Sequence, residues 1–211
     1  MFVRTLYITT DPAEVGPALD VIAKAVPGMM AEQPGFDGIG IFADRTLGKI
    51  VTGSWWETEQ ALKDSDAKLR DRRMETLTPF VSSITVMDFE AAAYSRPASA
   101  NSGGFRLERL SFAPDQVEPM VEAFKDVGLG HLRDIEGYQG ASMLVNRTYA
   151  IASVSVLYSD LDTLAASRGP QSALRKAGLG RTQGVHLVSL EEYEVVELDL
   201  PTSNPLPPPA R

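Results

Sequence analysis

The segment Pro34-Gly35-Phe36-Asp37-Gly38 recurs at positions 102 higher as Glu136-Gly137-Tyr138-Gln139-Gly140, and Arg45-Thr46 recurs in the same register as Arg147-Thr148. Single matches continue from the start of each half to its end. They are Arg4 with Arg106, Val15 with Val117, Pro17 with Pro119, Gly28 with Gly130, Leu62 with Leu164, Ser65 with Ser167, Leu77 with Leu179, Val86 with Val188 and Glu90 with Glu192. An ungapped register of this length indicates an internal duplication.

The duplication predicts a division of the 211 residues into four segments. Residues 1–94 form a first repeat and residues 105–200 a second. Residues 95–104 are small, Pro-rich and Gly-rich, as a linker is. Residues 201–211 have the composition of a polyproline II segment and are predicted to be a disordered tail. That tail is either a frayed terminus or a ligand for a proline-binding module.

Composition narrows the class of protein. Hydrophobic residues at 44% and charged residues at 23% are typical of a globular chain with a real core. The net charge of -8 argues against nucleic acid as a partner, because phosphate recognition depends on clustered positive charge. The absence of cysteine is compatible with a reducing compartment, so we expect a cytoplasmic protein. No signal peptide or run of about 18 apolar residues is present, so no membrane association is expected.

Each half predicts the same order of elements. In the first, Phe2 to Ile8 is rich in β-branched and aromatic residues, and Asp11-Pro12-Ala13-Glu14 signals a helix start. We expect this helix to end by Pro27-Gly28 or by Gln33-Pro34-Gly35. Pro17 implies either a late start or a kink.

The rest of the first half predicts a hairpin, a helix and a final strand. Two β-rich runs, Phe36 to Ala43 and Lys49 to Trp56, flank a five-residue turn, and Thr58 can cap a second helix. In that helix we expect a buried face with Ala61, Leu62, Leu69 and Met74, and a solvated face with Lys63, Asp64, Lys68, Arg70, Asp71, Arg72 and Arg73. Ser83 to Ala91 completes a β-α-β-β-α-β, ferredoxin-like order. The second half repeats it with Arg106 to Phe112, Asp115 to Leu132, Tyr138 to Val145, Tyr149 to Tyr158, Asp160 to Lys176 and Val185 to Leu198.

Each ferredoxin-like sheet has helices on one face, and its other face needs cover, which a tandem copy can provide. We therefore predict an α+β fold in which the two repeats pack sheet to sheet as an intrachain α+β barrel. The pattern resembles the dimeric α+β barrel superfamily, and particularly its antibiotic biosynthesis monooxygenase branch. Three features carry the resemblance: Pro34-Gly35-Phe36-Asp37-Gly38 opening the second strand, the hairpin with Arg45, and Ser54-Trp55-Trp56-Glu57-Thr58-Glu59-Gln60-Ala61-Leu62 running from strand to helix. Single-repeat members form homodimers, so the chain resembles a fused pseudo-dimer, and further self-association stays open.

The resemblance implies a tryptophan near the cavity between sheet and helices. Trp55 and Trp56 are the only tryptophans, and a strand points them to opposite faces. Their counterparts are Leu157 and Tyr158, which favours Trp56 as the structural residue and Trp55 as the one free to specialise. Both could instead be core residues.

Other candidate ligand-binding residues lie on or beside the predicted strands and helix ends. The aromatic candidates are Tyr7, Phe36, Phe42, Tyr138 and Tyr158. Arg4 and Arg106 could meet a ligand oxygen, or could pair with a carboxylate of the fourth strand such as Glu90 or Glu192. His131 and His186 could act as a base or could be structural, His131 as a cation at a helix end.

No phosphate-binding loop, GxGxxG before a helix, HExxH or GxSxG is present, so we expect neither a nucleotide cofactor nor a metal. Haem-degrading relatives carry a histidine ligand on the second helix, and the corresponding segments Thr58 to Leu77 and Asp160 to Leu179 contain none. The resemblance thus implies a cofactor-independent monooxygenase acting on a small aromatic or polycyclic substrate, with haem binding or degradation less favoured. The alternative is a non-catalytic ligand-binding or scaffold protein of the same fold.

Overall fold

A computed structural model of the chain describes residues 1–95, 101–179 and 184–199. These residues divide into two compact units, one comprising Met1–Phe89 with the chain from Glu194, the other Glu90–Tyr193. Of the predicted linker, Ser95 ends one strand and Gly104 begins the next, whereas residues 96–100 lie outside the described ranges, as does the predicted tail.

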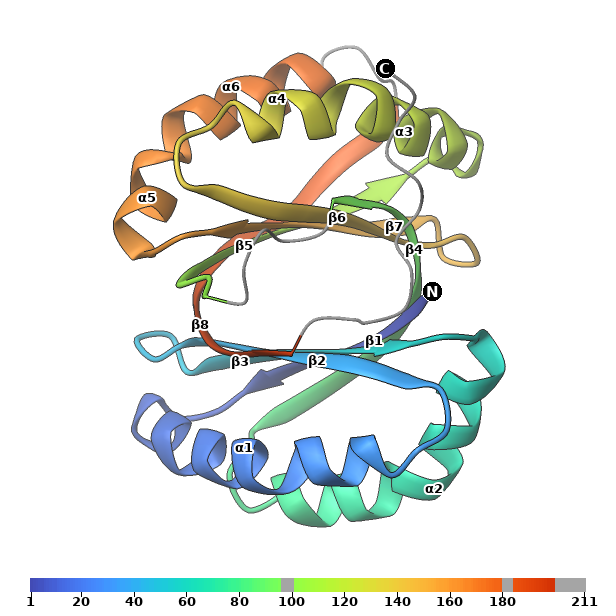
Figure 1. Cartoon of the computed structure of the whole chain (residues 1–211), viewed down its shortest axis with the longest axis vertical. Coiled ribbons are helices and arrows are strands. Elements are labelled where there is room, and N and C mark those ends of the chain that lie inside the picture. Colours follow the sequence, from blue (N-terminus) through green and yellow to red (C-terminus); the bar gives the residue numbers. More distant parts are fainter. Residues whose placement is uncertain (96–100, 180–183, 200–211) are drawn as a thin grey trace. The chain divides into compact units, whose positions relative to one another are not determined.

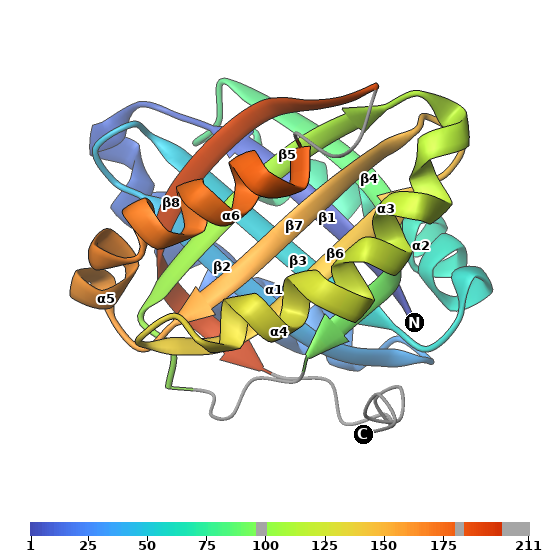
Figure 2. The same cartoon turned by 90° about the horizontal axis from the view of Figure 1, so that it is seen from above.

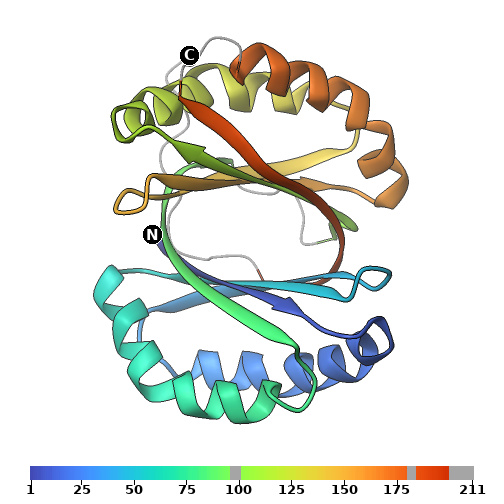
Figure 3. The same cartoon turned by 180° about the vertical axis from the view of Figure 1, so that it is seen from behind.

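The first unit consists of a sheet with two helices on one face (Figures 1 and 3). Strand β1 (Phe2–Thr9) is followed by a 3₁₀ turn (Pro12–Glu14) and helix α1 (Val15–Ala31). The hairpin β2 (Phe36–Asp44) and β3 (Lys49–Trp56) precedes α2 (Glu59–Leu77) and β4 (Ser83–Ser95). The predicted antiparallel hairpin is confirmed, and Thr58 caps α2 by accepting a hydrogen bond from the Ala61 amide, 3.1 Å away.

The second unit repeats this order, with its helices across one face of its sheet (Figure 2). Strand β5 (Gly104–Phe112) leads through a 3₁₀ turn (Pro114–Gln116) into α3 (Val117–Ala123), a π-helical turn (Phe124–Gly128) and α4 (Leu129–Arg133). Strands β6 (Tyr138–Asn146) and β7 (Ile151–Tyr158) precede α5 (Leu161–Ala166), α6 (Arg168–Leu179) and β8 (Val185–Asp199).

The eight strands are hydrogen-bonded in the order β1-β3-β2-β8-β5-β7-β6-β4, which closes into a barrel. The predicted α+β fold with two ferredoxin-like repeats is therefore confirmed. The last strands run longer than predicted: Glu194–Asp199 of β8 lie in the first unit and pair with β2, and Glu90–Ser95 of β4 lie in the second unit and pair with β6.

Prolines in α1 are accommodated without a break. The 3₁₀ turn makes the helix start late, so Pro17 falls in its first turn, where an N–H needs no helical acceptor. Of the two expected ends, the one at Pro27-Gly28 is wrong, because α1 continues through Pro27 to Ala31, and the one by Gln33-Pro34-Gly35 is confirmed. Pro27 has no N–H to donate to the Ala23 carbonyl. Ala23 is exposed, so water can bind that carbonyl instead.

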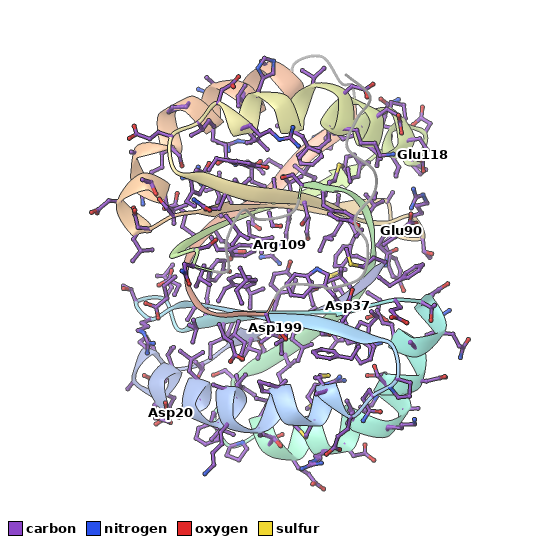
Figure 4. All side chains as sticks on the ribbon, viewed as in Figure 1. Asp20, Asp37, Glu90, Arg109, Glu118 and Asp199 are labelled. Atoms are coloured by element: carbon purple, nitrogen blue, oxygen red, sulfur yellow. The ribbon has the colours of Figure 1, made fainter. Side chains whose placement is uncertain are left out.

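The two faces of α2 differ from the prediction at two positions. Leu62 and Leu69 are buried as expected, but Met74 is 41% exposed. Arg73, assigned to the solvated face, is buried, because its Nη2 donates to Asp66 Oδ1 over 2.8 Å and its long stem can pack while its charge is paired. On α1, Asp20 is exposed and points away from the sheet (Figure 4).

The first hairpin requires glycine at position 48. Its φ is +64°, and a Cβ there would lie 2.1 Å from the Thr10 carbonyl oxygen. We expect Gly48→Ala to lower the free energy of unfolding by more than about 1 kcal/mol. Gly28→Ala is the matched control, because Gly28 lies inside α1 with open space around it and should gain about 0.5–1 kcal/mol. Urea unfolding of both variants checks this, and equal effects would contradict it.

Candidate functional site

A cleft on the helix side of the second unit, here called the second cleft, has a volume of about 410 Å³. This volume lies at the lower end of the range of about 300–1,000 Å³ for ligand pockets. It lies where the end of α4 approaches the junction of α5 and α6. Its lining residues are His131, Asp134, Ile135, Glu136, Ala166, Ser167, Pro170 and Leu174.

The first unit has a cleft at the equivalent place, here called the first cleft, of about 320 Å³. Its lining residues are Gln33, Pro34, Gly35, Glu57, Thr58, Gln60, Ala61, Asp64, Ser65 and Lys68. Five positions line both clefts when the repeats are superposed in their 102-residue register. The repeats have therefore kept one location and changed its chemistry.

Three of the five shared positions change from polar to apolar, and one, Glu136 in place of Pro34, changes from apolar to polar. Ile135 stands where the first repeat has Gln33, Ala166 where it has Asp64, and Pro170 where it has Lys68. Ser167 and Ser65 are the same residue in both clefts. A mostly apolar lining with a few polar groups is typical of sites for small organic ligands.

Pro170 also accounts for a break in the helix layer. Helix α2 is continuous over Glu59–Leu77, whereas its counterpart is divided at Ser167 into α5 and α6. A proline has no N–H and its ring crowds the preceding turn, so Pro170 cannot donate to the Ala166 carbonyl. The substitution that makes the second cleft more apolar thus also opens the helix beside it.

A buried arginine lies beneath the second cleft. Arg106 of β5 is 1% exposed, and its Nη1 donates to Ser167 Oγ at 2.9 Å and to Gln171 Oε1 at 2.5 Å. Its Nη2 donates to the Leu164 carbonyl at 2.8 Å and to Glu192 Oε1 at 2.7 Å. Arg106 was expected to meet either a ligand oxygen or a carboxylate of the fourth strand, and the structure contains the ion pair with Glu192.

The network extends through Gln171 to other strands. The Tyr158 hydroxyl donates to Gln171 Oε1 at 2.6 Å, and Gln171 Nε2 donates to Glu108 Oε1 at 3.1 Å. Arg175 Nη1 lies 2.6 Å from the same Glu108 oxygen. Burial raises the pKa of the Tyr158 phenol, so this group is a neutral hydrogen-bond donor. These mutual bonds hold the floor of the second cleft in one arrangement.

The first unit has a different ion-pair cluster in this place. Arg4 pairs with Asp88 through its Nη2 at 2.7 Å and with Asp66 of α2 through its Nη1 at 3.1 Å. The expected ion pair with a carboxylate of the fourth strand is therefore present, but its residue is Asp88 and not Glu90, which pairs with Arg147. Bulges interrupt the register of β4 and β8. The arginines of the two repeats therefore pair with carboxylates at positions that do not correspond.

Three predicted aromatic residues share the face of the first sheet that is turned away from its helices. Val51 pairs with Tyr7 on one side and Phe42 on the other, and Trp55 lies two steps along the same strand from Gly53. A Cβ on Gly40 would lie 2.7 Å from the Phe42 ring and 3.1 Å from the Trp55 ring, so these rings meet over Gly40. On the second sheet, Arg109 of β5 occupies the corresponding face (Figure 4).

The other aromatic candidates belong to the helix side. Trp56 is fully buried, donates from Nε1 to Ser54 Oγ at 3.0 Å, and meets Phe36 edge to face with 5.6 Å between centroids. Tyr158 is equally buried at the matching position. Tyr138 is half-buried and its hydroxyl bonds Ser95. Trp55 and Trp56 line neither of the two clefts described above.

The two histidines lie in different places in the second repeat. His131 is exposed in the last turn of α4 and lines the second cleft. His186 is exposed near the start of β8 and lines neither cleft. Sequence reasoning missed Asp134, Ile135, Ser167 and Leu174, although comparing the repeats position by position shows the polar-to-apolar exchange.

Within the described ranges, no three histidine or acidic side chains gather in a way that could hold a metal ion. None of the helices in those same ranges is long and apolar enough to cross a membrane.

Known proteins resemble the chain in fold. No family model matches it. Two uncharacterized Mycobacterium tuberculosis proteins are 28% identical over 184 residues, covering 86% of this chain and 80% of the relative, and 24% identical over 197 residues, covering 92% and 83%. An anthrone oxidase-like protein superposes with a TM-score of 0.72 and 16% identity, covering 94% of this chain and 92% of its own.

Two further solved structures agree. A candidate monooxygenase from Lactobacillus acidophilus has a TM-score of 0.69 and 14% identity over 94% of this chain and 95% of its own. A Listeria monocytogenes ferredoxin-fold protein related to antibiotic biosynthesis monooxygenases has a TM-score of 0.52 and 8% identity, with coverages of 93% and 96%. The chain has the dimeric α+β barrel fold. Its structural neighbours are antibiotic biosynthesis monooxygenase-like proteins, and identities this low speak to the fold, not to the reaction.

The ion pair beneath the second cleft predicts an acid dependence of stability. Burial raises the pKa of Glu192, but hydrogen bonds from Arg168 and Arg106 outweigh it and leave the pKa below its usual 4.5. A lowered folded-state pKa contributes stability above the unfolded value, and this contribution is lost as the pH falls through the folded value. We expect Glu192→Gln to cost about 3 kcal/mol at pH 7, because Arg106 loses its counter-charge, and clearly less at pH 3.5.

Glu197→Gln is the control of opposite sign. Burial and then Asp199 raise the pKa of Glu197, so its ionised form destabilises the fold at neutral pH. This variant should leave stability at pH 7 unchanged or higher. Urea unfolding at both pH values measures these effects, and a Glu192→Gln loss of equal size at both would contradict the assignment.

Proposed function

We propose that the protein oxidises a small aromatic molecule with dioxygen, without a cofactor, in the second cleft. The observation that carries the proposal is the apolar surface of Ile135, Ala166 and Pro170, at positions where the first repeat has polar residues, with His131 in the same lining. The anthrone oxidase-like protein and the monooxygenase-related proteins among the structural neighbours support the reaction class.

The chemistry needs an electron-rich phenol, enol or activated CH₂ group. A base removes one proton, the resulting anion passes an electron to dioxygen, and the two radicals combine as a peroxide anion. The protonated base returns its proton to this anion, which gives a hydroperoxide. Loss of water from that hydroperoxide leaves a carbonyl, so CH₂ plus O₂ gives C=O plus H₂O. The protein has to orient the ring and accept one proton.

The side chains of the second cleft can divide these tasks. Ile135, Pro170 and Leu174 supply apolar surface for a flat ring. His131 brings the only imidazole in the lining of this cleft, and an imidazole nitrogen can accept a proton from a bound ligand. The first cleft, with Gln33, Asp64 and Lys68, offers neither that surface nor a histidine.

Oxygen uptake with anthrone, whose enol tautomer carries an O–H donor, tests the proposal. We expect protein-dependent uptake and formation of anthraquinone, reduced about 100-fold or more by His131→Gln through loss of the base. His186→Gln is the matched control, since it removes the only other histidine of the chain from outside the cleft, and it should keep the wild-type rate.

Two results would overturn this function. The first is an oxidation rate equal to that of buffer alone. The second is equal activity in the His131→Gln and wild-type proteins. Saturable binding of anthrone without oxygen uptake would support the non-catalytic ligand-binding alternative.

A further inference from the structure

The wall of the second cleft offers hydrogen-bond acceptors. Ser167 is 2% exposed, and its single hydroxyl hydrogen is given to the Leu164 carbonyl, 2.7 Å away. Its oxygen already accepts from Arg106 Nη1 at 2.9 Å. A serine oxygen has two lone pairs, so in this arrangement it can present one more acceptor site and no donor.

The helix break adds a second acceptor of independent origin. In an α-helix the Ala166 carbonyl would receive the N–H of residue 170, and residue 170 is a proline. The corresponding carbonyl in the first repeat, at Asp64, faces Lys68, which has an N–H, within the continuous helix α2. The Ala166 carbonyl thus lost its helical donor when the second repeat gained Pro170.

The carboxylates at the rim also favour a ligand with hydrogen-bond donors. Asp134 and Glu136 line the cleft, and both are exposed carboxylates, which accept hydrogen bonds and repel anions. Arg106 does not offset them at the ligand, because it is buried and its donors go to Glu192, Ser167, Gln171 and Leu164.

We propose that Ser167 makes the second cleft selective for neutral aromatic molecules that carry an O–H or N–H donor, and that the cleft discriminates against aromatic ethers and carboxylates. The donor of the ligand bonds the Ser167 oxygen, with the Ala166 carbonyl as a second acceptor, while the ring packs on the apolar wall. Arg106 and Gln171 are positioning residues that hold Ser167 in place. This inference rests on the proposed function in taking the same cleft as the binding site.

Binding of three naphthalenes of the same ring size tests the inference. They are 2-naphthol, which has a donor, 2-methoxynaphthalene, which has only an acceptor, and 2-naphthoate, which is an anion. We expect the wild-type protein to bind 2-naphthol about 10-fold more tightly than the ether, with the carboxylate weakest, because an unmatched acceptor is costly. Isothermal titration calorimetry gives the three dissociation constants.

Two variants attack the acceptors separately. Ser167→Ala should bring naphthol and ether within about 3-fold of each other. Pro170→Ala restores an N–H to the helix, so it should fold at least as stably and reduce the same preference without touching Ser167. Ser65→Ala is the matched control, because Ser65 makes the same bond to Leu62 at 2.7 Å in the first cleft, and it should keep the full preference.

The outcomes are distinct. Tighter binding of 2-naphthoate, an unchanged preference in Ser167→Ala, loss of it in Ser65→Ala, or no binding of any naphthalene would each overturn the donor selection. Donor selection without oxygen uptake in the anthrone assay would instead sustain this inference and reject the oxidation. Oxygen uptake by a protein that prefers the ether or the anion would do the reverse.

Discussion

The sheet of each unit depends on backbone hydrogen bonds along one edge of a hairpin strand, β2 in the first unit and β6 in the second. An unpaired strand edge exposes a row of amides and carbonyls, and in each unit that row is met by the end of a strand that begins in the other repeat. Residues Glu194–Asp199 meet β2, and residues Glu90–Ser95 meet β6. Neither repeat completes its own sheet, and the helix layers and clefts are built on sheets completed in this way.

Much of the fold was predictable because the same order of elements is encoded in both repeats. The hairpin around Arg45 and the helix start at Thr58 follow from local rules that hold in both copies, and the helix start at Asp11-Pro12 follows from a side-chain cap that the first copy alone has. Pairings between distant strands were less accessible. The partner of Arg4 is Asp88 rather than Glu90, since bulges shift the final strands. Arg73 is buried because it pairs with Asp66, two turns earlier in α2.

The candidate site was predictable only in part, for a related reason. Trp55 and Trp56 stand out by composition, yet Trp56 packs into the core and Trp55 meets Phe42 on the other face of the sheet. The second cleft is made of ordinary residues, Ile135, Ala166, Ser167 and Leu174, which come together only through the packing of α4, α5 and α6 over the sheet. Beneath that wall the Arg106 network replaces the Arg4–Asp66–Asp88 cluster of the other repeat, so the buried polar groups and the cleft diverged together.

The division of one helix at Ser167, beside an unbroken counterpart, has an evolutionary consequence. In a homodimer of single repeats every substitution appears twice. A proline that shapes a cavity by weakening a helix therefore destabilises both subunits. Gene fusion removes that symmetry. Here Lys68 keeps one helix whole while Pro170 opens the other, so the chain can specialise one half and leave its twin to carry the fold.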